Sequence, residues 1–269
     1  MNDIAMKRRT RLTFLVSLVN TGLIVFAVYV SANPSAQTPT SPKPAPSPRR
    51  PLRKPVGGSR GFDQYAKREA SSRLVAGAAT RGATDSASLR YEEGEAAYAA
   101  GKYQKAIEGF SEAVRLSPNW AEAHYALALS LTEMQKPKAA IEEFKRVLKL
   151  KAKYELMVLS NYNIGNAYVD LGEYKKAIDA YKQAIELNPE LSKPHNNLGL
   201  AYAASDQPAA AVAEFKEAVQ LKPDFAEAHF NLGVAYLQSD QKHEAEEQQR
   251  ILTKLDTELA SKLDALIKQ

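Results

Sequence analysis

The sequence predicts an all-α fold, a solenoid of about five helical hairpins closed by a C-terminal capping helix. Residues 161–189 contain two short segments of helical pattern, which meet at Leu-Gly-Glu-Tyr and end at Asn-Pro. The same skeleton returns 34 residues later and again after another 34, a period typical of helical repeat arrays. Beyond the last repeat an apolar stripe continues through Leu252, Leu255, Leu259, Leu263 and Leu266. A terminal helix with a neighbour on one side only needs such a stripe.

The composition and charge of the chain exclude several kinds of site and divide the chain into parts. The chain of 269 residues contains no cysteine, which excludes disulfides, thiolate metal sites and cysteine nucleophiles. Residues 1–86 carry a net charge of +10, whereas residues 87–269 carry −5. We therefore predict three parts: an N-terminal basic and apolar segment (1–30), a basic linker (31–86) and the repeat domain (87–269).

The N-terminal segment has the pattern of a single transmembrane helix. Residues 12–30 hold no charge, and nineteen helical residues at about 1.5 Å each span the hydrocarbon of a bilayer. The basic cluster at residues 7–11 favours a cytoplasmic N-terminus, with the repeat domain on the outer, periplasmic side. The alternative is a signal peptide cleaved near residue 32, which would release a secreted protein. The apolar run is longer than the usual 7–15 residues of such a peptide.

The linker has the composition of a stiff, disordered spacer. Residues 33–55 contain eight prolines, and proline-rich chains adopt extended polyproline II structure. Its basic residues suggest an alternative function, in which the linker binds an anionic surface or nucleic acid. The acidic repeat domain argues against nucleic acid as a partner. Whether residues 61–86 dock on the first repeat stays open.

The repeat units begin at Ala87, Ala121, Val158, Ser192 and Ala226, and positions are counted from each start. A small residue at position 8 lets two antiparallel helices approach, and a large residue at position 24 fills the space between hairpins. Proline at position 32 ends the second helix. The second unit has Ala152 in place of this proline, and three extra residues precede the third unit. In the fifth unit Gln249 replaces the large residue.

This skeleton resembles the tetratricopeptide repeat, which has Leu-Gly at positions 7 and 8, Tyr at 11, Ala at 20, an aromatic at 24 and Pro at 32. The fourth unit carries all of them, as Leu198, Gly199, Tyr202, Ala211, Phe215 and Pro223. The resemblance implies a right-handed superhelix whose first helices line a concave groove. Such grooves bind extended peptides or partner helices, and few members are enzymes. The expected function is therefore a non-catalytic scaffold for protein–protein interaction.

Position 6 of the first helix is expected to face this groove. Asn163, Asn197 and Asn231 occupy it in the last three units. An amide both donates and accepts hydrogen bonds, so such a row can pair with the backbone of an extended peptide. Asn166 stands beside the row, and Tyr162, Tyr125 and Phe230 at position 5 offer aromatic anchors. The alternative is that these asparagines only cap or solvate their helices.

The sequence lacks the residues that other kinds of binding or catalytic site would require. The carboxylate clamp of chaperone-binding family members is not expected, because Tyr162 and Glu227 stand where it needs lysines. His124, His195 and His229 all fall at position 4, where the family packs one helix on the next, so we expect packing residues and no metal site. No catalytic constellation is visible, and no cofactor or small-molecule substrate is expected.

Overall fold

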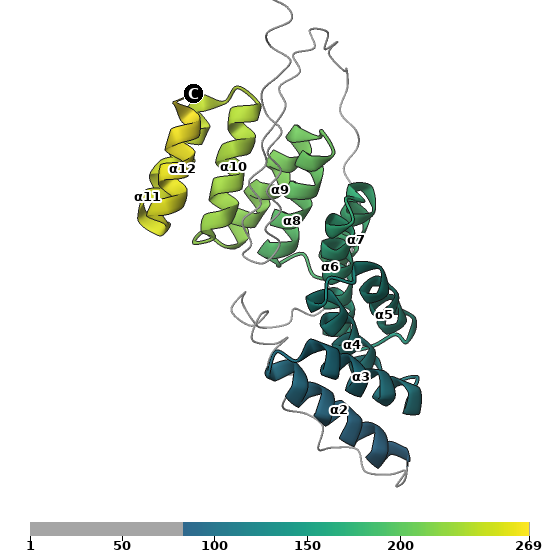
Figure 1. The fold of residues 1–269 in the computed structure, drawn as a ribbon. Helices are drawn as coiled ribbons and strands as arrows, with labels where there is room; N and C mark the ends of the chain where they lie inside the picture. Colours follow the sequence, from purple (N-terminus) through teal and green to yellow (C-terminus); the bar gives the residue numbers. More distant parts are fainter. Residues whose placement is uncertain (1–82, 269) are drawn as a thin grey trace, which may run out of the picture. The chain divides into compact units, whose positions relative to one another are not determined.

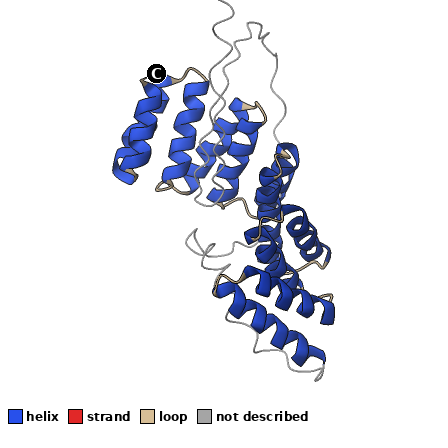
Figure 2. Cartoon of the chain, in the orientation of Figure 1, coloured by secondary structure: helices blue, strands red, loops and turns tan. Residues whose placement is uncertain are grey.

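The computed structural model describes residues 83–268, and within this range the chain forms helices and no strand (Figure 2). The predicted membrane segment (12–30) and proline-rich segment (33–55) lie outside the described residues. Among the described helices, none is both long and apolar enough to cross a membrane.

The helices alternate as the repeat predicts, and helices consecutive in the sequence contact one another (Figure 1). The first helices of the five units are α2 (Ala83–Ala99), α4 (Ala121–Glu133), α6 (Tyr154–Asp170), α8 (Ser192–Ala204) and α10 (Ala226–Gln238). The second helices are α3 (Tyr103–Leu116), α5 (Pro137–Lys149), α7 (Tyr174–Leu187), α9 (Pro208–Leu221) and α11 (Lys242–Leu255). The capping helix is α12 (Thr257–Ile267). The predicted all-α array of helical hairpins is confirmed.

The turn inside each hairpin uses one left-handed residue at position 15. Glycine adopts this conformation at no steric cost, whereas other residues are strained in it. The five residues are Gly101 (φ 69°), Gln135 (φ 54°), Gly172 (φ 71°), Asp206 (φ 58°) and Asp240 (φ 56°). Three of the five turns therefore form without the residue best suited to them.

The extra residues before the third unit lengthen a helix. The helix α6 has 17 residues and starts at Tyr154, four residues before the unit start at Val158. By contrast, α8 and α10 have 13 residues and begin at their unit starts. One helical turn holds about 3.6 residues, so the insertion adds a turn at the N-terminus of α6. The helix α2 also starts early, at Ala83, inside the predicted linker.

In the first, third and fourth hairpins, the large side chain at position 24 packs over the glycine at position 8. A methyl group added at Gly199 would lie 2.6 Å from Cε1 of Phe215, and one at Gly94 would lie 2.7 Å from Cδ1 of Phe110. Tyr181 covers Gly165 in the same way. Each of these three rings thus packs against the glycine of its own unit. Glycine, which has no side chain, leaves room for the ring at these three positions.

In the fifth unit, a residue from another helix occupies the space over the glycine at position 8. Gln249 stands at position 24, and Leu263 of α12 instead lies over Gly233, where Leu263 Cδ2 would clash with an added methyl group. Two leucines of the predicted apolar stripe, Leu255 and Leu266, are 38% and 37% exposed. The helix breaks between them at Asp256, whose carboxylate accepts hydrogen bonds from two backbone N–H groups of α12. This N-cap resets the helical register, so the stripe does not continue unbroken.

Candidate functional site: the polar face of the first helices

The predicted asparagines form a hydrogen-bonded row that joins neighbouring first helices. The Asn163 amide nitrogen donates to the Tyr125 hydroxyl of α4 at 3.1 Å. The Asn197 amide nitrogen donates to the Tyr162 hydroxyl at 3.2 Å and to Asn166 Oδ1 at 3.0 Å, both on α6. We call this surface of α2, α4, α6, α8 and α10, at positions 6, 9 and 13, the polar face.

The row continues into the last unit and into the core. The Asn231 amide nitrogen donates to Asn196 Oδ1 of α8 at 2.9 Å. The buried Tyr181 hydroxyl of α7 donates to Asn166 Oδ1 at 2.7 Å. Backbone contacts between α4 and α6, α6 and α8, and α8 and α10 accompany these bonds. The amide donors therefore join one unit to the next, a contact that the sequence did not predict.

The row keeps capacity for a ligand. Asn163, Asn197 and Asn231 are each half-buried, so part of every side chain meets solvent. The Oδ1 atoms of Asn163 and Asn231 have no hydrogen-bond partner among residues 83–268. An amide oxygen has two lone pairs that accept N–H groups. The amide donors bind neighbouring helices, and the oxygens of Asn163 and Asn231 remain available to accept hydrogen bonds from a ligand.

The aromatic residues at position 5 differ in exposure. Tyr125 and Phe230 are 7% and 5% exposed, and the Tyr125 ring packs 5.5 Å from Phe144, centroid to centroid. Burial raises the pKa of the Tyr125 hydroxyl, against the opposing effect of its bond to Asn163. Tyr162 is half-buried, with its ring 6.0 Å from that of Tyr181. The structure thus brings Tyr125 and Tyr162 into the row by their hydroxyls and places Phe230 in the core beside it.

Three histidines repeat one geometry that sequence reasoning did not identify. In His124, Nδ1 lies 2.6 Å from Glu143 Oε2 of the second helix, and Nε2 lies 2.9 Å from the carbonyl oxygen of Pro118 in the preceding turn. His195 and His229 make the same two contacts in their units, with Glu214 and Pro189 and with Gln248 and Pro223. No group of metal-ligating side chains occurs in residues 83–268. The available signal was the spacing of 19 residues between each histidine and its acidic or amide partner.

The partners of His124 favour its charged form. Both ring nitrogens face acceptors, and only the imidazolium donates from both. The hydrogen bond to Glu143 raises the pKa of His124, more than burial lowers it. The third unit has no such histidine contact, because Asn161 and Ala180 replace the histidine and its partner. The Asn161 amide nitrogen instead donates to the carbonyl oxygen of Met157 in its own helix at 3.1 Å.

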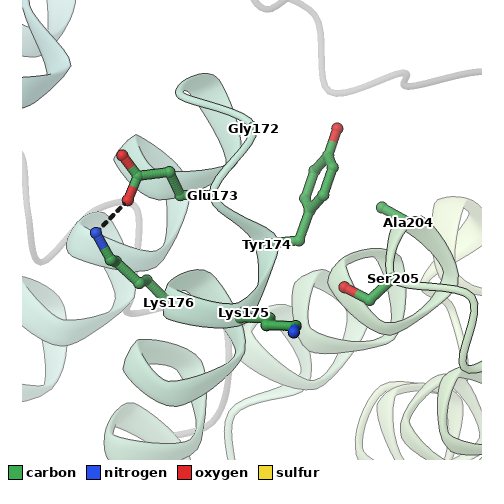
Figure 3. A pocket seen from close by; sticks show the side chains of 7 residues that line it. All are labelled: Gly172, Glu173, Tyr174, Lys175, Lys176, Ala204 and Ser205. Atoms are coloured by element: carbon green, nitrogen blue, oxygen red, sulfur yellow. Dashed lines mark ion pairs between the residues drawn. The ribbon is translucent and has the colours of Figure 1, made fainter.

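A separate open hollow of about 450 Å³ lies at the turn between α6 and α7 (Figure 3). Figure 3 shows Glu173 paired with Lys176 and the ring of Tyr174 standing across from Ala204 and Ser205. The hollow contains no nucleophile paired with a base, and none of the predicted site residues lines it. We therefore place the candidate site on the polar face.

Two family models match the chain. One, described as TPR repeat, matches residues 94–135, 165–206 and 207–240. The other, described as tetratricopeptide repeat, matches residues 121–154 and 226–258. Together the two models cover more than half of the 269 residues.

A curated relative is the small glutamine-rich tetratricopeptide repeat-containing protein 2 of Mycosarcoma maydis, which is 29% identical over 97 residues. This match covers 36% of this chain and 27% of the relative, so the chain spans about a quarter of that protein.

Solved structures resemble the array at lower identity. MamA from Desulfovibrio magneticus RS-1 is 22% identical with a TM-score of 0.61, over 66% of this chain and 98% of that one. YrrB, described as a TPR protein with an unusual peptide-binding site, is 19% identical with a TM-score of 0.56, over 76% of this chain and 97% of that one. Likeness at this identity concerns the fold. The hairpin repeat and the two matching models show that the chain belongs to the tetratricopeptide repeat family.

Proposed function

We propose that this protein is a non-catalytic scaffold that binds an extended segment of a partner protein along the polar face. Proteins of this family generally act as scaffolds for protein–protein interaction. The observation that carries the finer proposal is the pair of unpartnered acceptors, Asn163 Oδ1 and Asn231 Oδ1, on half-buried side chains. An extended peptide presents backbone N–H groups whatever its sequence, and such groups are the natural donors to these oxygens. The peptide-binding site named for YrrB supports this mode of binding.

The test is a pull-down with the full-length chain and a triple variant, Asn163→Ala, Asn197→Ala and Asn231→Ala. The wild-type chain should capture a partner that the triple variant does not retain. Because the amides also join the units, each variant needs an unchanged helical circular dichroism signal and a recorded melting temperature.

A matched control separates the two roles of Asn163. The variant Tyr125→Phe removes the hydroxyl that accepts the Asn163 donor and leaves the Asn163 oxygen in place. It should retain the partner. Equal capture by wild type and triple variant would place binding on another surface.

We further propose that residues 12–30 hold the chain in a membrane, with the repeats on the outer side. The uncharged run and the basic residues before it support this orientation. Alkaline extraction should leave the chain in the membrane fraction, and external protease should digest the repeats. A mature N-terminus beyond residue 32 would instead support the secreted alternative.

A further inference from the structure

The polar face changes its chemistry along the array. Position 6 is Glu92 in the first unit and asparagine in the last three, and position 9 is Glu95 in the first unit and Asn166 in the third. Position 13 carries Glu133 on α4 and Asp170 on α6. The corresponding side chains of α8 and α10 are uncharged, namely Asn197, Leu200, Ala204, Asn231, Val234 and Gln238. One end of the face is therefore acidic, and the other is amide and apolar.

The carboxylates of the acidic end have no cationic partner within residues 83–268. Other carboxylates of the array do pair, as Glu143 does with His124 and Glu112 with Arg115. Glu92, Glu133 and Asp170 are exposed, and Glu95 is half-buried. The Tyr98 hydroxyl of α2 lies 3.5 Å from Glu133 Oε1 of α4, which brings the two helices' polar groups together.

Desolvation disfavours the charged form of two of these carboxylates, Glu95 and Asp170. Burial raises the pKa of Glu95 to about 7, the nearby charge of Glu92 adds to this effect, and a hydrogen bond to Tyr91 opposes it. Asp170 is exposed, but the surrounding atoms desolvate its carboxylate enough to raise its pKa. An opposite charge placed nearby stabilises an ionised carboxylate, and nothing in the described chain supplies it. A ligand with positive side chains would.

We propose that the partner segment bound by the polar face is basic, with its Lys or Arg side chains over α2, α4 and α6 and its uncharged portion over α8 and α10. This inference rests on the proposed function and adds the charge and the direction of the ligand.

The test measures the amino-acid composition of the peptides that the chain binds. Immobilised full-length chain in mild non-ionic detergent is exposed to random-sequence peptides, and the retained fraction is sequenced. We expect Lys and Arg to be enriched several-fold over the input, the size expected for ion pairs that are partly exposed. The enrichment should fall as salt rises, because salt screens exposed charges.

Two variants locate the effect. Glu92→Gln with Glu95→Gln keeps the shape of the side chains, removes two of the four carboxylates and should clearly reduce the basic enrichment. Glu217→Gln with Glu246→Gln removes two exposed carboxylates from α9 and α11 and should leave it unchanged. Equal losses in both variants would mean that only the net charge of the chain matters, and would overturn the inference.

The remaining outcomes separate this inference from the proposed function. Peptides that are retained by wild type, lost by the triple asparagine variant and not enriched in Lys or Arg would overturn the inference and leave the function standing. Retention no greater than that of the triple variant would overturn both.

Discussion

The packing of Phe215 over Gly199 makes a quantitative prediction about stability. The Phe215 ring is 1% exposed and fills the space between α8 and α9. Truncation to alanine removes the ring and leaves a cavity, and buried Phe→Ala changes cost about 3–5 kcal/mol. The variant Phe215→Ala should lose this amount in urea denaturation followed by circular dichroism. The neighbouring change Glu217→Gln, at an exposed position on α9, should stay within about 0.5 kcal/mol.

A second substitution tests the geometry itself. In the wild-type chain, Gly199→Ala places a methyl group 2.6 Å from the Phe215 ring, and such overpacking costs about 1–3 kcal/mol. In the Phe215→Ala background the clash is gone, and alanine favours a helix over glycine by about 1 kcal/mol. The effect of Gly199→Ala should therefore change sign between the two backgrounds. A loss below about 1 kcal/mol for Phe215→Ala, or the same effect of Gly199→Ala in both, would refute the assigned packing.

Much of the fold could be predicted from the sequence because its period is exact enough to align five units. Small and large residues at fixed positions indicated where two helices cross, and the rings of Phe110, Tyr181 and Phe215 are buried as expected. The sequence could not predict which residue fills the space in the fifth unit, where the large side chain at position 24 is absent. Leu263, thirty residues after Gly233, fills the space of an absent ring, since α12 packs on α10.

The sequence predicted the residues of the candidate site, but it did not predict the hydrogen bonds between them. The spacing of 34 identified Asn163, Asn197 and Asn231 as one surface. Their hydrogen bonds run to hydroxyl and amide groups more than thirty residues away, and such pairings depend on how one unit lies against the next. The contact between His124 and Glu143 joins the two helices of one unit, and the repeated spacing of 19 residues was its signal in the sequence.

Three further predictions follow from local geometry. Gln135→Gly should stabilise the chain by up to about 1 kcal/mol in urea denaturation, because Gln135 has φ 54° and glycine relieves that strain; no gain would contradict it. The pKa of His124 is raised in the folded chain, so its contribution to stability should be complete below the ordinary value of 6.5 and lost as pH rises through the raised pKa. Urea midpoints measured against pH should show this loss, and Glu143→Gln should reduce it; an unchanged slope would be the opposing result. Asp256→Ala removes the N-cap of α12 and should cost about 0.5–2 kcal/mol, with faster amide exchange in α12, whereas unchanged exchange would argue against the cap.

The most direct test of the central claim is the affinity of one retained peptide for three forms of the full-length chain. The two free acceptors, Asn163 Oδ1 and Asn231 Oδ1, would each lose a hydrogen bond worth about 0.5–1.5 kcal/mol, so the triple change of Asn163, Asn197 and Asn231 to alanine should weaken binding by about five- to 150-fold. Tyr125→Phe should bind as the wild-type chain does, since it disturbs only the bond between two first helices. Equal dissociation constants for the wild type and a folded triple variant would contradict the claim that the asparagine row binds the partner.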